Sequence, residues 1–120
     1  MNNSSELRSS LTQFYGTEQY YFNPLYRWMK YTDGVKFFAE NAANGAYWLL
    51  DIIGTELKAL TKKEDFLNIV FNSANNQGVI TVDDGNDNIL YTRNIEYTDC
   101  PEGEWKFYLT GDVLMLPTEY

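Results

Sequence analysis

Carboxylates are the side chains of this sequence best suited to chemistry, because histidine is absent and Cys100 is the single cysteine. Without histidine the chain has no Ser-His or Cys-His pair and no imidazole general base. One cysteine alone also cannot supply the ligands of a typical zinc site. Pairs such as Asp51 with Glu56, or Glu96 with Asp112, could do acid–base work. Nothing singles out one pair, so we predict no catalytic residue, no metal and no cofactor.

Acidic residues are concentrated in the last third of the chain. Residues 1–80 carry eight acidic and seven basic side chains, a net of −1, whereas residues 81–120 carry nine and two, a net of −7. A protein that binds nucleic acid directly has the opposite sign. Carboxylates held on a rigid sheet could instead imitate phosphate spacing and pair with a basic protein surface. The residues predicted for this role are Asp83, Asp84, Asp87, Glu96, Asp99, Glu102 and Glu104.

The alternative for these acids is a solvated sheet edge with charged hairpin tips, where charge prevents edge-to-edge association. The stretch DDGNDN at residues 83–88 superficially resembles a calcium loop, but it lacks the EF-hand spacing. A hairpin turn is the better interpretation. Cys100 precedes Pro101 with acids nearby, which predicts a raised thiol pKa and an unreactive side chain.

The second candidate surface is the aromatic segment 17–31, TEQYYFNPLYRWMKY. With Arg27 and Lys30 among its rings, it could stack on bases or contact a protein partner. The alternative is that these rings pack in the core beneath the helices, and this interpretation is favoured because aromatic side chains dominate the cores of small domains. For a partner-binding surface we select Tyr20, Tyr21, Tyr26 and Trp28.

Helical spacing of apolar residues predicts the element that would support these surfaces, a helix over residues 46–60. Shorter helices are predicted over residues 4–15 and from Thr32 or Asp33 through Ala43. Alternating apolar residues then predict strands at 66–72, 79–83, 88–97, 104–110 and 113–116. Short turns between consecutive strands indicate an antiparallel meander. We therefore predict a single α+β domain over residues 1–120, with helices (about 4–60) packed on one face of a meander of four to five strands (about 66–116).

The chain has no apolar run long enough for a membrane span, and its start, MNNSSELRSS, lacks the features of a signal peptide. A single cysteine fits a reducing compartment. We expect a cytoplasmic protein with no membrane partner.

Three segments, LTQFYGTEQYY, YTDGVKFFAENAANGAYWLLDII and EYTD…FYLTGDVLMLPTEY, resemble a family of short uncharacterised bacterial, plasmid and phage proteins, a domain of unknown function. The resemblance covers nearly the whole chain. It implies a single cytoplasmic domain carried on mobile elements in a bacterial host. It supplies no catalytic residue.

These observations favour a non-enzymatic acidic binding protein. We expect a mobile-element inhibitor, similar to anti-CRISPR proteins, that occludes the basic nucleic-acid-handling surface of a host defence protein such as a CRISPR effector or another nuclease. One alternative is a small-ligand-binding or hydrolytic domain that uses carboxylates in a helix–sheet pocket. Another is a homodimeric accessory protein joined through its sheet.

Overall fold

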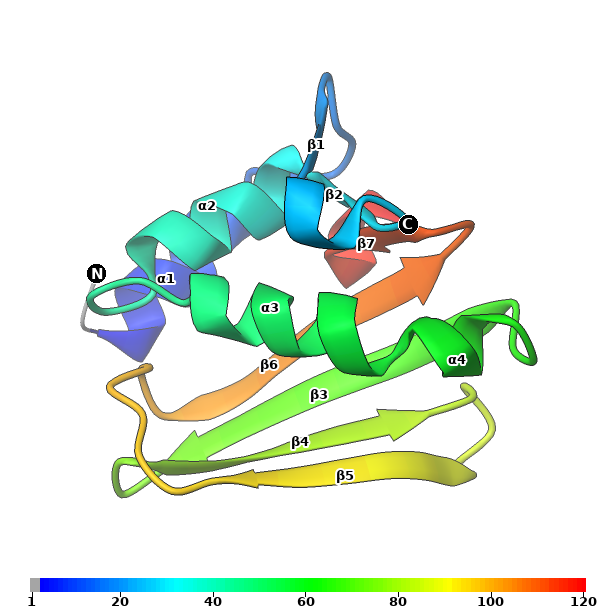
Figure 1. Cartoon of the computed structure of the whole chain (residues 1–120). Helices are drawn as coiled ribbons and strands as arrows, with labels where there is room; N and C mark the ends of the chain where they lie inside the picture. The colour runs from blue at the N-terminus through cyan, green and yellow to red at the C-terminus, as the bar shows by residue number, and fades with distance from the viewer. Residues whose placement is uncertain (1–2) are drawn as a thin grey trace.

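A single seven-stranded sheet organises the chain, with strands in the order β1-β2-β7-β6-β3-β4-β5 (Figure 1). The computed structural model describes residues 3–120. The strands are β1 (Tyr20–Phe22), β2 (Lys30–Thr32), β3 (Phe66–Ala74), β4 (Gln77–Asp83), β5 (Ile89–Ile95), β6 (Gly103–Thr110) and β7 (Val113–Met115). The helices are α1 (Ser4–Leu11), α2 (Asp33–Asn41), α3 (Tyr47–Glu56) and α4 (Lys58–Thr61), with 3-10 turns η1 (Pro24–Tyr26) and η2 (Pro117–Glu119).

The α+β class is confirmed, and β3, β4 and β5 form consecutive antiparallel strands as predicted, but β6 does not continue that meander. β6 pairs antiparallel with β3 and not with β5, so the chain crosses the ends of β4 and β3 between β5 and β6. This register aligns Trp105, Phe107 and Leu109 with the apolar face of β3. The sheet is also mixed, because β2 and β7 run parallel. Five of its strands match those predicted, and β1 and β2, from the aromatic segment, raise the number to seven.

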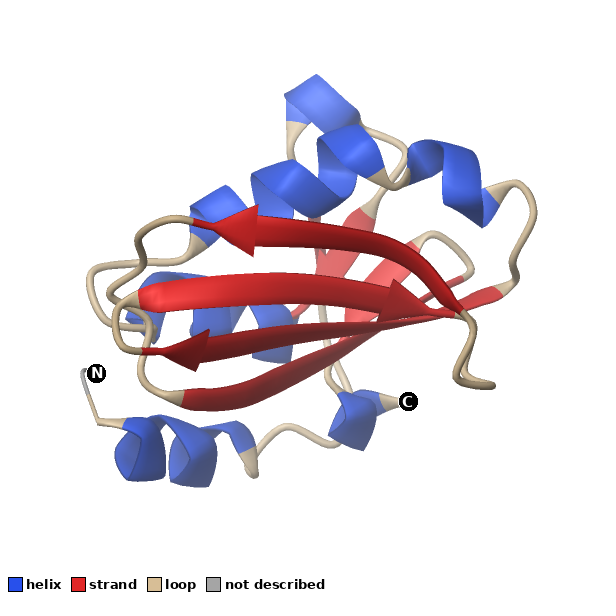
Figure 2. Cartoon of the chain, turned by 90° about the horizontal axis from the view of Figure 1, so that it is seen from below, coloured by secondary structure: helices blue, strands red, loops and turns tan. Residues whose placement is uncertain are grey.

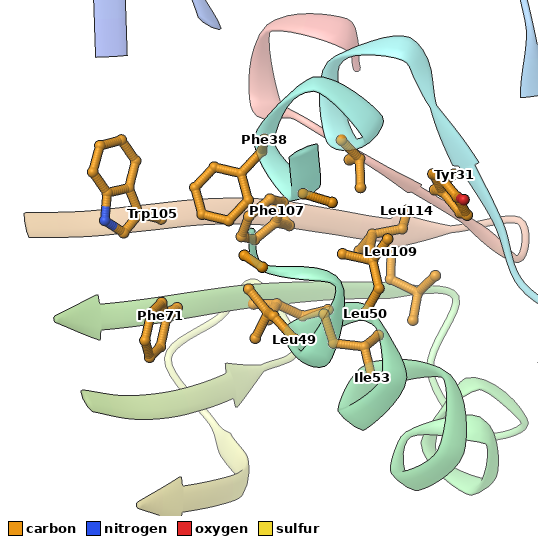
Figure 3. Packing of buried hydrophobic residues seen from close by; sticks show 14 of the residues in the cluster. Tyr31, Phe38, Leu49, Leu50, Ile53, Phe71, Trp105, Phe107, Leu109 and Leu114 are labelled. Atoms are coloured by element: carbon orange, nitrogen blue, oxygen red, sulfur yellow. The ribbon is translucent and has the colours of Figure 1, made fainter. Parts of the chain in front are cut away.

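One face of the sheet is covered by α2 and α3, and the core lies between these helices and the sheet (Figure 3). Thr32 caps α2 as predicted, with its hydroxyl accepting the N–H of Val35. Apolar side chains of α2, of its C-terminal cap and of α3 are fully buried: Val35, Phe38, Ala39, Ala42, Leu49, Leu50 and Ile53. The helix predicted over residues 46–60 is interrupted at Leu57 and forms α3 and α4.

The arrangement is not a simple pair of layers, because α1 and η2 lie on the opposite side of the strands from α3 and α4 (Figure 2). α1 ends at Leu11, earlier than predicted, and Asn3 caps it. Leu7 is buried in the core, whereas Tyr15, the last residue of the predicted helix, lies beyond α1 and is largely exposed. In the C-terminal turn, the Glu119 carboxylate accepts the Thr32 hydroxyl, 2.6 Å away.

Within residues 3–120, none of the helices combines the length and the apolar character that crossing a bilayer requires.

Candidate functional site

The seven predicted acidic residues do not form one surface. Asp83, Asp84 and Asp87 lie at the β4–β5 turn, at one end of the sheet. The other four lie in the β5–β6 connection and the start of β6, at the opposite end (Figure 1). The sequence could not reveal this separation, because β5 lies between the two groups and carries each to a different end. The two groups are therefore separate candidate surfaces.

The larger group belongs to residues 96–104, which we call the acidic loop. It contains Glu96, Asp99, Glu102 and Glu104 and no basic residue. Exposed within it is Tyr97, with 70% of its surface accessible. An exposed aromatic ring surrounded by charges is typical of a protein-binding surface. The sequence placed Tyr97 on a strand face, so its exposure at the strand end was not foreseen.

Buried polar contacts hold the acidic loop against the sheet. The Thr98 N–H donates to the Asn76 carbonyl at 2.9 Å, and the Ser73 hydroxyl donates to the Cys100 carbonyl at 3.0 Å. The Trp105 indole N–H donates to the Pro101 carbonyl at 2.8 Å. Because these bonds join backbone groups of Thr98, Cys100 and Pro101 to residues of the sheet and its turn, the loop backbone is fixed before any partner arrives.

Two of the loop carboxylates also stabilise neighbouring turns. Asp99 accepts the Asn44 N–H at 3.3 Å, and Glu102 accepts the Asn75 N–H at 3.2 Å. Glu104 lies 4.0 Å from the Lys106 ammonium, both largely exposed. An exposed pair at this distance contributes little, so the loop keeps most of its negative charge.

The smaller group serves mainly to shape the hairpin predicted at DDGNDN, which the structure confirms. Asp83 accepts the Gly85 N–H at 2.7 Å, and Asp84 accepts the Asn86 N–H at 2.8 Å. Asn88, whose side chain donates to Asp84, is the first cause of the lowered Asp84 pKa. Asp87 has a φ of 67°, a conformation that aspartate tolerates in turns.

The aromatic segment is divided between core and surface. Tyr26 is buried, Trp28 donates its indole N–H to the Gly54 carbonyl, and Tyr21 stacks on Tyr31 at 5.6 Å. Of the four residues predicted to contact a partner, Tyr20 alone is mostly exposed, at 58%.

Two apolar residues that the prediction omitted accompany Tyr20 on the surface. Phe22, on the same face of β1, is 49% exposed, and Leu25 is 87% exposed. Arg27 lies over the Phe22 ring at 5.5 Å. We call residues 20–27 the aromatic segment surface; its first part, β1, projects from the body of the molecule (Figure 1).

The carboxylate pairs considered for acid–base work do not form catalytic pairs in the structure. Glu96 and Asp112 lie beyond opposite ends of β6. Glu56 is bonded to Tyr91 and Arg93, and Asp51 accepts the Tyr26 hydroxyl at 2.7 Å. Burial, followed by this bond, raises the pKa of Tyr26. Every acidic side chain in residues 3–120 is at least partly exposed, and in that range no three Cys, Asp or Glu side chains are placed to hold a metal ion.

Cys100 is buried, where the sequence placed it in a turn. Burial first, and Asp99 second, raise the pKa of its thiol to about 12. The predicted direction is confirmed, but desolvation and not the neighbouring charge is the main cause.

The fold and these surfaces define a small acidic α+β domain with a fixed, charged loop and a projecting aromatic segment. The chain belongs to DUF6876, a family of unknown function, whose model matches residues 5–120. The resemblance to a domain of unknown function is therefore confirmed, whereas its association with bacteria, plasmids and phages stays a prediction. No curated protein and no solved structure gives a significant match.

Proposed function

We propose that this protein is a non-enzymatic binding protein whose acidic loop docks on a basic surface of another protein. The observation that carries the proposal is the exposure of Tyr97 among four carboxylates on a loop fixed by the sheet. In such a surface the ring supplies desolvated contact area, and the carboxylates select and attract lysine and arginine side chains.

The specific form that we propose is inhibition of a host defence protein. Carboxylates held on a fixed loop can pair with the basic residues of a groove that otherwise holds a phosphate backbone, and the net charge of −8 opposes direct binding of nucleic acid. A CRISPR effector or another nuclease in the cytoplasm of a bacterial host is the class of partner that this chemistry fits. The family's unknown function leaves this form to be tested directly.

The aromatic segment surface supports a second contact. Tyr20, Phe22 and Leu25 expose apolar surface close to Arg27, a composition common in the centre of interfaces. Because this surface is built on β1, at the other edge of the sheet from β5, one small partner need not contact both regions.

The test is an affinity capture from bacterial lysate, with the purified protein as bait at low and high salt. The loop variant carries Glu96→Lys and Glu102→Lys. The matched control carries Glu18→Lys and Glu40→Lys, two exposed acids outside the loop, and has the same net charge. We expect the wild type and the control to retain a basic protein that high salt releases.

The loop variant should lose that protein, and Tyr97→Ala should weaken its retention. Equal loss from the loop variant and the control would mean that net charge alone governs capture. Capture that salt does not affect would also contradict the proposal. Light scattering of the bait alone reports whether the protein forms the homodimer considered from its sequence.

A further inference from the structure

A groove beside β6 adjoins the acidic loop and shares Glu104 with it. β6 has eight residues, but β7 pairs only with its last three, from Tyr108 to Thr110. After Met115 the chain leaves the edge of the sheet and enters η2. The first five residues of β6 therefore have no strand beside them on this edge, and α1 lies next to them instead. The space between α1, β6 and η2 is a cavity of about 440 Å³, which we call the β6 groove. It is lined by Arg8 and Leu11 of α1, Glu104 and Lys106 of β6, and Leu116 and Pro117 before and within η2.

The backbone of Lys106 faces this groove. Gly111 and Asp112 form a two-residue turn with φ of 57° and 61°, so the flanking residues Thr110 and Val113 bond directly to each other. In a strand the backbone groups of alternate residues point to the same edge. Lys106 and Glu104 therefore present their N–H and C=O groups where β7 would lie if it were longer. The Arg8 guanidinium already donates to the Glu104 carbonyl at 3.1 Å, which confirms this orientation.

The groove thus combines an unpaired strand edge with apolar walls. Leu11, Leu116 and Pro117 supply the apolar surface, and the volume is in the range of sites that bind ligands. Arg8 and Lys106 carry two positive charges against the single negative charge of Glu104, so the groove has the opposite sign to the molecule as a whole.

We propose that the β6 groove binds an extended peptide segment of a partner protein, with apolar and acidic side chains, as an additional strand antiparallel to β6. The segment continues the line of β7 and bonds to the N–H and C=O of Lys106. Its apolar side chains pack against Leu11 and Leu116, and a carboxylate pairs with Arg8. Addition of a strand to an open sheet edge is an established mode of peptide recognition.

The probe is a phage-displayed library of random nonapeptides, selected on the full-length protein. The best binder is then synthesised and its affinity is measured by calorimetry. Lys106→Pro removes the outward N–H without breaking a bond to β3, because proline is tolerated where the N–H points away from the neighbouring strand. Lys106→Ala is the matched control, which loses the same charge and keeps the N–H.

We expect peptides with alternating apolar and acidic residues. Lys106→Pro should weaken binding of the synthetic peptide about tenfold more than Lys106→Ala does, since proline leaves a carbonyl group of the bound peptide unpaired. Hydrogen exchange at the Lys106 amide of the wild type should slow when the peptide binds. A second variant, Thr12→Trp, fills the groove from α1 without altering β6 and should also abolish binding.

Failure to select any peptide would overturn the proposal. So would equal affinity for the two Lys106 variants when both fold, or unchanged binding to Thr12→Trp. These outcomes are independent of the acidic-loop proposal, because Glu96→Lys alone lies outside this groove and outside the adjoining hollow that Glu102 lines with Arg8, and should leave peptide affinity within about twofold.

Discussion

Asp33 shows how one carboxylate fixes the segment that leads into the sheet. It accepts the Glu18 N–H at 2.9 Å and the Tyr21 hydroxyl at 2.8 Å. The bond from the Glu18 backbone is the first cause of its lowered pKa, and that from Tyr21 the second. A carboxylate bonded in this way ties residues 17–21 to the start of α2.

We predict that this contribution is lost in acid. The pKa of Asp33 in the folded protein lies below its ordinary value of 3.8, so the folded state binds the proton less readily than the unfolded chain. The stabilisation is therefore complete above about pH 4 and disappears as the pH falls through the lower, folded pKa. Urea unfolding of the wild type and Asp33→Asn, from pH 7 to pH 2.5, measures it. The difference in unfolding free energy should shrink with decreasing pH; a constant difference would contradict the prediction.

Gly54 shows a second single-residue constraint, a close contact between helix and ring. A Cβ at this position would lie 2.3 Å from the Tyr26 ring, which is held in place by its hydroxyl bond to Asp51. Alanine normally stabilises a helix interior relative to glycine by about 1 kcal/mol. Here the clash should dominate, and we predict that Gly54→Ala destabilises the protein by about 1–3 kcal/mol.

Gly16→Ala is the matched control, since a Cβ at Gly16 meets nothing within 4 Å. Thermal unfolding of both variants measures the effect. An unfolding temperature of Gly54→Ala at or above that of the wild type would show that Tyr26 moves aside at little cost.

Strands were the elements that the sequence predicted best, because alternation is a local property. The predictions for β3, β5 and β6 differ from the observed strands by two residues or fewer at each end. Their order was not predictable in the same way, because pairing depends on which apolar faces meet after the chain closes. β1 and β2 have three residues each, too few to show a period, and they form by pairing with each other and with β7.

The features of the candidate sites also divide into those that local sequence predicts and those that depend on distant segments. The number of acids is a local property, so the sequence identified the four carboxylates of the acidic loop, although it grouped them with Asp83, Asp84 and Asp87 from the other end of the sheet. The exposure of Tyr97 and the burial of Tyr26 depend on the path of distant segments. The β6 groove had no signal in the sequence, because it exists only where β7 stops short and α1 lies alongside.

Local stability should differ between these strands. β3 pairs with β4 over seven residue pairs and with β6 over eight, whereas β1 pairs with β2 over three and has an open edge. Opening β1 exposes few buried groups, so its amides should exchange without global unfolding. We predict that the Tyr21 amide exchanges on the order of a hundredfold faster than the Ile69 amide. Exchange followed by NMR measures this, and equal rates would mean that the sheet opens as one unit.

Charge is the property that acts on the whole molecule at once. The net charge is −8, and the ion pairs found in residues 3–120 are Arg93 with Glu56 and Lys106 with Glu104. Most carboxylates therefore repel one another without a cation close by. The same unpaired charge that suits a basic partner costs the isolated fold some stability.

Salt should then have opposite effects on folding and on binding. Raising NaCl from 0.1 to 1 M shortens the screening length from about 10 Å to about 3 Å, which weakens repulsion within the folded state. We predict a gain on the order of 1 kcal/mol, or about 4 °C in unfolding temperature for a domain of this size. The control carries Glu18→Lys and Glu96→Lys, each worth +2, which changes the net charge from −8 to −4. Its gain should be clearly smaller, because a general effect of salt on hydrophobic burial would be the same in both proteins. Equal gains would assign the effect to burial, and a loss of stability in the wild type would mean that its few ion pairs outweigh the repulsion.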